Sequence, residues 1–137
     1  MVKQFWINLP VKDINKSIEF FSKIGFSIDT QYGNTAESAN LVIGDKGVVV
    51  MLFTESMFKN FARNEIIDSQ QATEVLLSFD AESREEVDEI TKKAVEAGGT
   101  IFGEPGDNGW MYGSGFADLD GHRWNVLYMD MSKMPKD

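Results

Sequence analysis

The sequence predicts an α+β fold in which two βαβββ modules pair, so that their curled mixed sheets surround a central cleft. Three observations predict this fold. The order strand, helix and three strands occurs twice, over residues 4–53 and 73–130; an amphipathic helix follows the first strand of each half; and glycine turns separate the last strands. Because each sheet buries one face beneath its helix, the other face is available to line the cleft.

The first half begins with an alternating stretch, QFWINLPV, and continues into a helix whose apolar residues recur at helical spacing. Asp13 is placed to cap the N-terminus of this helix, and Gly25 is placed to end it. The buried stripe comprises Ile14, Ile18, Phe21 and Ile24. Three strands are expected next, FSIDTQY, SANLVIG and KGVVVMLF, with a turn at residues 44–47 between the last two.

The second half repeats this order from the strand TEVLLSFD onward. Ser83 is the expected N-cap of its helix, with Glu86 completing a capping box, and Gly98-Gly99 ends the helix. Its buried stripe comprises Val87, Ile90, Ala94 and Ala97. The strands TIFGEP, WMYGSGFAD and HRWNVLYMD follow, the last two joined by a turn at residues 118–121.

The segment between the halves, residues 54–72, has a different character. Met57, Phe58 and Phe61 can form one apolar face of a short helix, and a polar run follows them as a linker. We therefore expect a single domain, residues 1–137, built of two modules. The first spans residues 1–66 with the connecting helix and linker, and the second spans residues 72–137.

Charge and composition exclude several classes of function. The chain has 22 acidic and 13 basic residues, a net charge of −9, and no basic cluster larger than Lys92-Lys93, which argues against nucleic-acid binding. The absence of cysteine excludes disulfides and thiolate nucleophiles. The first residues contain no apolar stretch typical of a signal peptide or membrane span, so we expect a cytoplasmic protein with no membrane partner.

Strand alternation predicts which side chains line the cleft. They are Trp6 and Asn8, then Val49, Met51 and Phe53, then Glu74, Leu76 and Ser78, and finally Asn125 and Leu127. This apolar lining with a few polar groups suits a small organic molecule held by hydrogen bonds from Asn8, Asn125 and Glu74. The alternative is that its apolar members simply fill a closed core.

Glu74 carries a catalytic hypothesis. A carboxylate that faces an apolar cleft suits a general base or acid working near neutral pH. Glu74 also stands at the very start of its strand, beside the polar linker, and the alternative is that it lies in water at the rim.

The glycine-rich segment 103–112 contains two further candidates for ligand binding. Trp110 and Tyr112 can stack on a planar ligand if this hairpin folds over the pocket. The alternative is a plain β-hairpin whose glycines accommodate twist.

The stretches NLPVKDINKSIEFFSKIGF, SFDAESREEVDEITKKAVEAGG and FADLDGHRWNVLYMD resemble the vicinal oxygen chelate superfamily. Its members include glyoxalase I, extradiol dioxygenases, fosfomycin-modifying enzymes and bleomycin-binding proteins. The resemblance implies the glyoxalase/bleomycin resistance fold, a homodimer, and a divalent metal held at four positions, which here are Trp6, Met51, Glu74 and Asn125. Only Glu74 is a good metal ligand among them.

The departure from this ligand set decides the expected function. We expect a protein that binds a small organic molecule in an apolar cleft, with no catalytic metal and no other cofactor. One alternative is a glyoxalase-like lyase or a dioxygenase-type enzyme with an atypical metal site or with Glu74 as general base. The other is a regulatory or interaction module with a vestigial cleft. We expect a structural role for His122, the one histidine, with general acid or base catalysis as the alternative.

Overall fold

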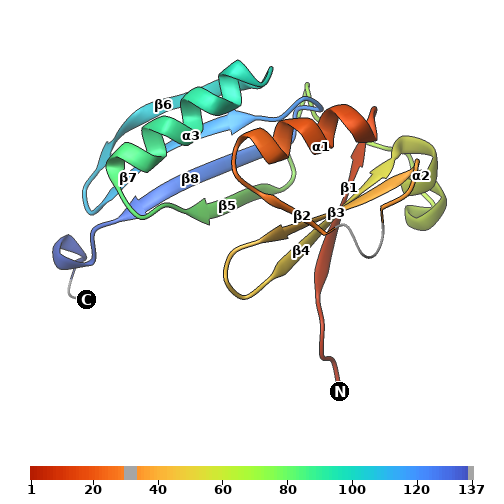
Figure 1. The fold of residues 1–137 in the computed structure, drawn as a ribbon, viewed down its shortest axis with the longest axis horizontal. Helices are drawn as coiled ribbons and strands as arrows, with labels where there is room; N and C mark the ends of the chain where they lie inside the picture. The colour runs from red at the N-terminus through yellow and green to blue at the C-terminus, as the bar shows by residue number, and fades with distance from the viewer. Residues whose placement is uncertain (30–33, 136–137) are drawn as a thin grey trace. The chain divides into compact units, whose positions relative to one another are not determined.

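The computed structural model describes residues 1–29 and 34–135, and the chain divides into two compact units, Met1–Asp68 and Ser69–Asp137. Each unit contains a four-stranded mixed sheet and a helix that packs on one face of that sheet (Figure 1). The predicted α+β class and the two βαβββ units are confirmed.

The first unit contains a sheet with the strand order β1-β4-β3-β2. Strands β1 and β4 are parallel, and the other pairs are antiparallel. Part of the strand expected at residues 26–32 lies outside the described residues. The elements are β1 (Trp6–Val11), α1 (Ile14–Lys23), β2 (Ser27–Asp29), β3 (Ser38–Ile43), β4 (Val48–Thr54) and α2 (Glu55–Ala62).

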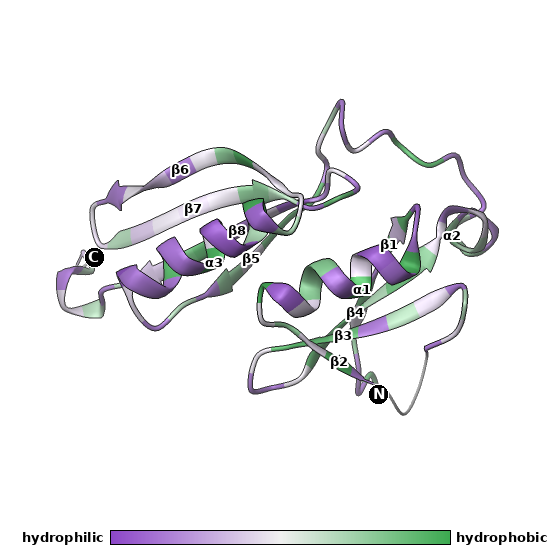
Figure 2. Ribbon diagram, turned by 45° about the horizontal axis from the view of Figure 1, so that its top comes forward, coloured by the Kyte–Doolittle hydropathy of each residue, from purple (hydrophilic) through white to green (hydrophobic). Residues whose placement is uncertain are grey.

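Helix α1 has the ends that local chemistry predicts. The backbone N–H of Lys16 donates to Oδ1 of Asp13 at 3.0 Å, and Gly25 takes a left-handed φ of 106° after the last turn. The helix is amphipathic, as the alternation of colours along it shows (Figure 2). Its buried side chains are Ile14, Ser17, Phe20 and Phe21. Ile18, expected in the stripe, is only partly buried.

The second unit contains a sheet with the order β5-β8-β7-β6, again with one parallel pair, β5 with β8. Strand β6 continues to Asn108, well beyond the predicted TIFGEP, and pairs with β7 as far as Asn108 and Met111. Across the described residues, no helix is both long and apolar enough to cross a membrane. The elements are β5 (Leu76–Asp80), α3 (Arg84–Glu96), β6 (Thr100–Asn108), β7 (Met111–Ala117), β8 (Arg123–Met129) and η1 (Met131–Lys133).

Helix α3 begins with a variant of the predicted capping box. Oγ of Ser83 accepts the N–H of Glu86 at 3.0 Å, while Oε1 of Glu86 accepts the N–H of Glu82 at 3.0 Å, one residue before the cap. Val87 packs in a buried cluster with Val126 of β8, which fixes the helix on its sheet.

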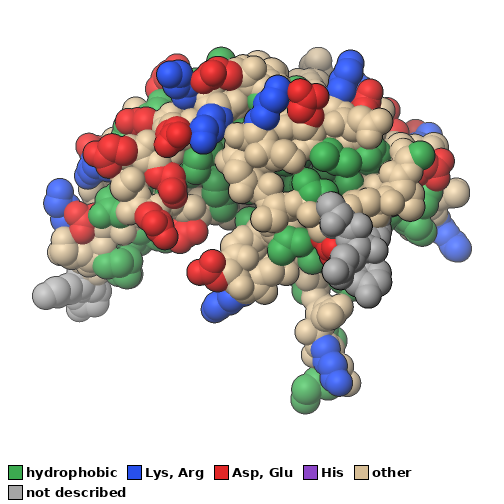
Figure 3. Space-filling model, viewed as in Figure 1, with side chains coloured by type: hydrophobic (Ala, Val, Ile, Leu, Met, Phe, Trp, Pro, Cys, Tyr) green, Lys and Arg blue, Asp and Glu red, His purple; other side chains and the backbone are tan. Residues whose placement is uncertain are grey.

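The acidic excess of the chain belongs almost entirely to its second half. Residues 69–137 carry fourteen acidic and six basic side chains, whereas residues 1–68 carry eight and seven. Acidic side chains gather on the outward face of α3 (Figure 3). This surface is therefore a poor partner for polyanions.

Candidate functional site

The face of the first sheet that points away from α1 carries the polar and aromatic side chains expected there. Leu9 of β1 is buried, whereas Trp6 and Asn8 alternate to the other face. The register places Asn8 opposite Met51 of β4, and Met51 opposite Asn40 of β3. These three residues form one row across the open face.

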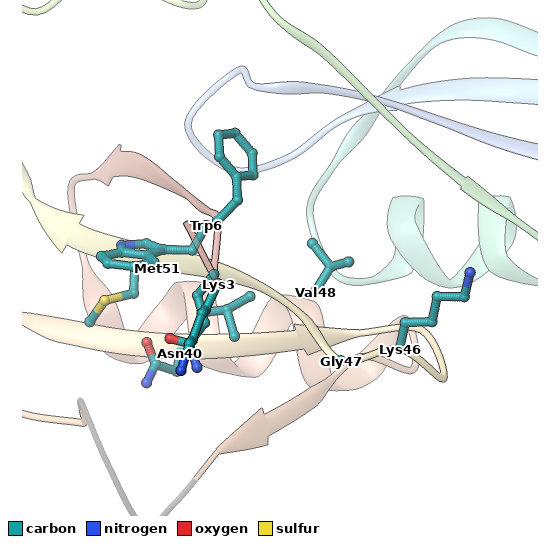
Figure 4. Close-up of a pocket in the computed structure, with 10 residues that line it drawn as sticks. Lys3, Trp6, Asn40, Lys46, Gly47, Val48 and Met51 are labelled. Carbon is teal, nitrogen blue, oxygen red and sulfur yellow. The ribbon is translucent and has the colours of Figure 1, made fainter. Parts of the chain in front are cut away.

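A hollow of about 470 Å³ lies over this face (Figure 4). Trp6, Met51 and Asn40 project into it from three different strands, and the β3–β4 turn adds Lys46. The side chain of Trp6 is 49% exposed although it stands within a strand. The first sheet therefore holds an open, partly aromatic surface that its own helices leave uncovered.

Phe53 stands on the same face but lies beneath α2. It is only 8% exposed, and its ring centroid is 5.2 Å from that of Phe61 of α2 in an edge-to-face arrangement. In this structure Phe53 closes one end of the face by packing.

The second sheet also has an open face, built differently. Asn125 and Leu127 of β8 alternate to the side away from α3 and line a hollow of about 220 Å³. A Cβ on Gly113 would lie 2.9 Å from the carbonyl oxygen of Val126 and collide with Leu127. Glycine at this point of β7 is therefore what lets the Leu127 side chain lie across the strand.

Glu74 lies outside the sheet. Strand β5 begins two residues later, at Leu76, and Glu74 occupies an exposed bend. No hydrogen bond or ion pair of Glu74 is present within residues 1–29 and 34–135. Its side chain is therefore exposed and not in apolar surroundings.

Trp110 and Tyr112 lie at the tip of the β6–β7 hairpin, and the structure separates them. Trp110 is in the two-residue turn, where its carbonyl accepts the N–H of Asp130 at 2.8 Å. Tyr112 turns to the α3 side, where its hydroxyl donates to Asp88 at 2.6 Å. This hydrogen bond raises the pKa of Tyr112 above its ordinary value of 10.0. Tyr112 thus faces away from Asn125.

Sequence reasoning missed Asp118, which organises the turn before β8. Its Oδ1 accepts the backbone N–H groups of Asp120 and His122, both at 3.0 Å, and its Oδ2 accepts Nε1–H of Trp124 at 3.0 Å. Burial raises the pKa of the Asp118 carboxyl, and the nearby His122 opposes that shift. The sequence pattern that could have identified Asp118 is an aspartate in a turn six residues before a strand tryptophan, whose indole N–H needs an acceptor when buried.

His122 takes part in this turn mainly through its backbone. Its ring Nδ1 lies 3.5 Å from Oγ of Ser69, a weak contact at the beginning of the second unit. His122 thus lies in the connection that leads into β8.

The four positions at which the resembling superfamily holds a metal do not fit one here. The side chains at 6, 51, 74 and 125 are an indole, a thioether, a carboxylate and an amide, and only the carboxylate is a strong ligand for a divalent transition metal. Among the residues that the structure describes, no group of three His, Asp or Glu side chains is placed to hold a metal ion.

Comparisons with known proteins agree with this architecture. The model of the Glyoxalase/Bleomycin resistance protein/Dioxygenase superfamily matches residues 3–126. A hypothetical protein from S. aureus is 34% identical, with a TM-score of 0.83 over 93% of this chain and 94% of its own. No protein with a curated description matches the chain.

Two more distant structures share the fold. A glyoxalase/bleomycin resistance protein/dioxygenase family enzyme from Burkholderia phytofirmans PsJN is 17% identical, with a TM-score of 0.76 over 90% of this chain and 96% of its own. The genomically encoded fosfomycin resistance protein from Listeria monocytogenes is 22% identical, with a TM-score of 0.66 over 97% of this chain and 98% of its own. With the family model covering most of its length, this chain belongs to the glyoxalase/bleomycin resistance protein/dioxygenase superfamily.

Proposed function

We propose that this protein binds a small organic molecule on the open face of its first sheet, without a catalytic metal. The observation that carries the proposal is the hollow of about 470 Å³ bordered by Trp6 and Met51, two positions at which the superfamily resemblance implies metal ligands. A volume of this size is typical of small-molecule sites.

The side chains of this face define what it can bind. The half-exposed indole of Trp6 offers a stacking surface, and the flexible thioether of Met51 adapts to irregular apolar shapes. Asn8 is exposed in the same row and supplies both a donor and an acceptor. A partly aromatic or aliphatic molecule with at least one hydrogen-bonding group matches this surface.

The side chains of this chain, more than its relatives, favour ligand binding without metal chemistry. A variant of the Listeria fosfomycin resistance protein was solved with Mn(II) and 1S,2S-dihydroxypropylphosphonic acid. The donor set of the present chain does not suit such an ion, because indole nitrogen has no lone pair for a cation and a thioether is soft. We therefore carry over only the capacity to bind a small molecule.

Tryptophan fluorescence tests this proposal directly. In a screen of small aromatic and aliphatic compounds, at least one should change the emission of the wild-type protein saturably. The change should vanish in Trp6→Phe and persist in Trp110→Phe, a matched control because Trp110 lies in the β6–β7 turn. If the fluorescence response persisted in Trp6→Phe, the proposal that the ligand binds on the first sheet would be wrong.

Native mass spectrometry of the purified protein tests the metal-free part of the proposal. We expect no stoichiometric transition metal, because three of the four implied ligands, an indole, a thioether and an amide, are poor ligands for a divalent transition metal. One equivalent of Ni, Zn, Fe or Mn per chain would contradict it.

We also propose that the protein is a homodimer. Strand β1 is an edge of the first sheet and β5 is an edge of the second, within the described residues, and each begins with an exposed apolar side chain, Trp6 in β1 and Leu76 in β5. Such edges favour pairing with another chain. Subunit counting by light scattering would show a twofold mass, and a monomer at micromolar concentration would refute the proposal.

A further inference from the structure

We propose that Arg123, stacked on Phe102, binds the carboxylate of a small organic anion on the open face of the second sheet. The guanidinium carbon of Arg123 lies 4.4 Å from the centroid of the Phe102 ring. Asn125 is the next residue of β8 on the same face. The residues of this site belong to a different unit from the residues of the hollow at Trp6.

A second arginine of the same unit shows what a completed arrangement looks like. The guanidinium carbon of Arg84 lies 5.0 Å from the centroid of the Tyr112 ring, and Arg84 also forms an ion pair with Asp107. The Tyr112 hydroxyl in turn donates to Asp88 at 2.6 Å. On the helix side, therefore, the stacked cation already has its anion.

Arg123 is stacked on an aromatic ring in the same way, but no carboxylate of the described residues is paired with its guanidinium. Within the part of the chain that the structure describes, its guanidinium forms no ion pair and no hydrogen bond. Carboxylates are abundant in this half, which has fourteen acidic and six basic residues. In the described chain, the guanidinium of Arg123 therefore lacks an ion-pair partner because of where it lies and not because carboxylates are scarce. An exposed carboxylate ligand would supply what Asp107 supplies to Arg84.

The platform beneath Arg123 is built by a glycine. A Cβ on Gly115 of β7 would collide with the ring of Phe102, so glycine allows this ring to lie across the strand. The ring is 40% exposed and carries the guanidinium above it. Stacking restricts the guanidinium to a plane and leaves its N–H edge available for two parallel hydrogen bonds to one carboxylate.

The neighbouring hollow defines the rest of the ligand. Its volume is about 220 Å³, and Phe102, Asn125 and Leu127 line it together with Glu104. The strand register places Arg123 and Leu127 four residues apart along β8, about 13 Å at the usual rise of a strand. Glu104 lies between the paired glycines 103 and 106, toward the Leu127 end, where it disfavours a second negative group. The ligand class is thus a small monocarboxylate with an apolar body.

Nuclear magnetic resonance of the full chain tests this proposal with benzoate as the probe. The Arg123 side-chain Nε–H signal should shift saturably as benzoate is added. The dissociation constant for benzamide, which lacks the charge, should be at least about tenfold higher than that for benzoate. Inorganic phosphate should bind more weakly than benzoate, because it cannot fill the apolar hollow. Equal binding of benzoate and benzamide, or tighter binding of phosphate, would overturn the proposal.

Variants locate the site. Arg123→Gln should abolish benzoate binding, and Arg123→Lys should weaken it, because an ammonium keeps the charge but loses the planar fork. Arg84→Gln is the matched control and should bind as the wild type does, because Arg84 stacks on the helix side. Dispersed amide spectra would show that each variant is folded. Wild-type affinity in folded Arg123→Gln, or an equal loss in Arg84→Gln, would sink the assignment.

Discussion

Replacing Asp118 should destabilise the second unit strongly, because one buried carboxylate satisfies three donors. A hydrogen bond to a charged group contributes about 1.5–3 kcal/mol, and a buried donor left without a partner costs about 1–3 kcal/mol. The indole N–H carries most weight, because Trp124 is only 2% exposed and water does not reach it. The Asp118→Ala change should therefore lower the free energy of unfolding by about 3–5 kcal/mol.

The Asp118→Asn variant separates the three hydrogen bonds. The amide oxygen can still accept both backbone N–H groups, but the amide NH₂ then faces the N–H of Trp124, so one bond is lost at about 1–3 kcal/mol. Trp124→Phe removes the facing donor. The cost of Asp118→Asn should consequently shrink in the Trp124→Phe background, a coupling measurable in a double-mutant cycle.

Urea unfolding followed by circular dichroism is the assay, with thermal scans as a second measurement. The alanine variant should melt roughly 9–15 °C lower, from about 3 °C per kcal/mol for a chain of this size. The reasoning would be refuted if Asp118→Ala cost less than about 1 kcal/mol, or if Asp118→Asn were equally destabilising with and without Trp124.

Two further predictions concern the hairpin of β6 and β7. The stability that the Tyr112–Asp88 hydrogen bond contributes is fully present below pH 10.0 and is lost as the pH rises through the raised pKa of Tyr112. In a carbon-detected titration, Asp88→Asn should move the Tyr112 midpoint down toward 10.0, and an unchanged midpoint would contradict the assigned cause. Gly113→Ala should cost about 1–3 kcal/mol in urea unfolding, because the Val126 carbonyl cannot yield. Gly106→Ala, whose Cβ would meet nothing closer than 3.9 Å, is its control and should be nearly neutral by comparison.

Helix ends were predictable from the sequence because capping acts over three or four residues. Asp13 and Ser83 both accept the N–H of the residue three positions later, as their sequence context predicts. Gly25 and Gly98 both adopt φ of 106°, the left-handed conformation that ends a helix.

The length of β6 was not predictable in the same way. The run from Gly103 to Gly109 has the composition of a loop, with Pro105 in its middle. The structure accommodates these residues because β6 is an edge strand with irregular register at Ile101/Gly103 and Gly103/Gly106, and its ladder comes from β7. The length of such a strand depends on its pairing with a neighbouring strand, which local sequence does not reveal.

The candidate sites likewise include features that local sequence predicts and features that depend on contacts between distant segments. Alternation alone predicted the open-face positions of Trp6, Met51 and Asn125, because a period of two is a local property. The stack of Arg123 on Phe102 was invisible, since it joins side chains of nonadjacent strands across a glycine. The grouping of Tyr112 with Trp110 ignored the neighbouring helix, which supplies Asp88 as a partner.

The uneven distribution of charge also has a consequence for how the two halves respond to their solvent. Self-repulsion among fourteen acidic and six basic side chains opposes the folding of residues 69–137, whereas residues 1–68 are close to neutral. Added salt screens that repulsion over a Debye length of about 10 Å at 0.1 M. Ionic strength therefore acts as a selective stabiliser: the C-terminal half gains resistance to denaturant as salt rises, while the N-terminal half is nearly indifferent to it.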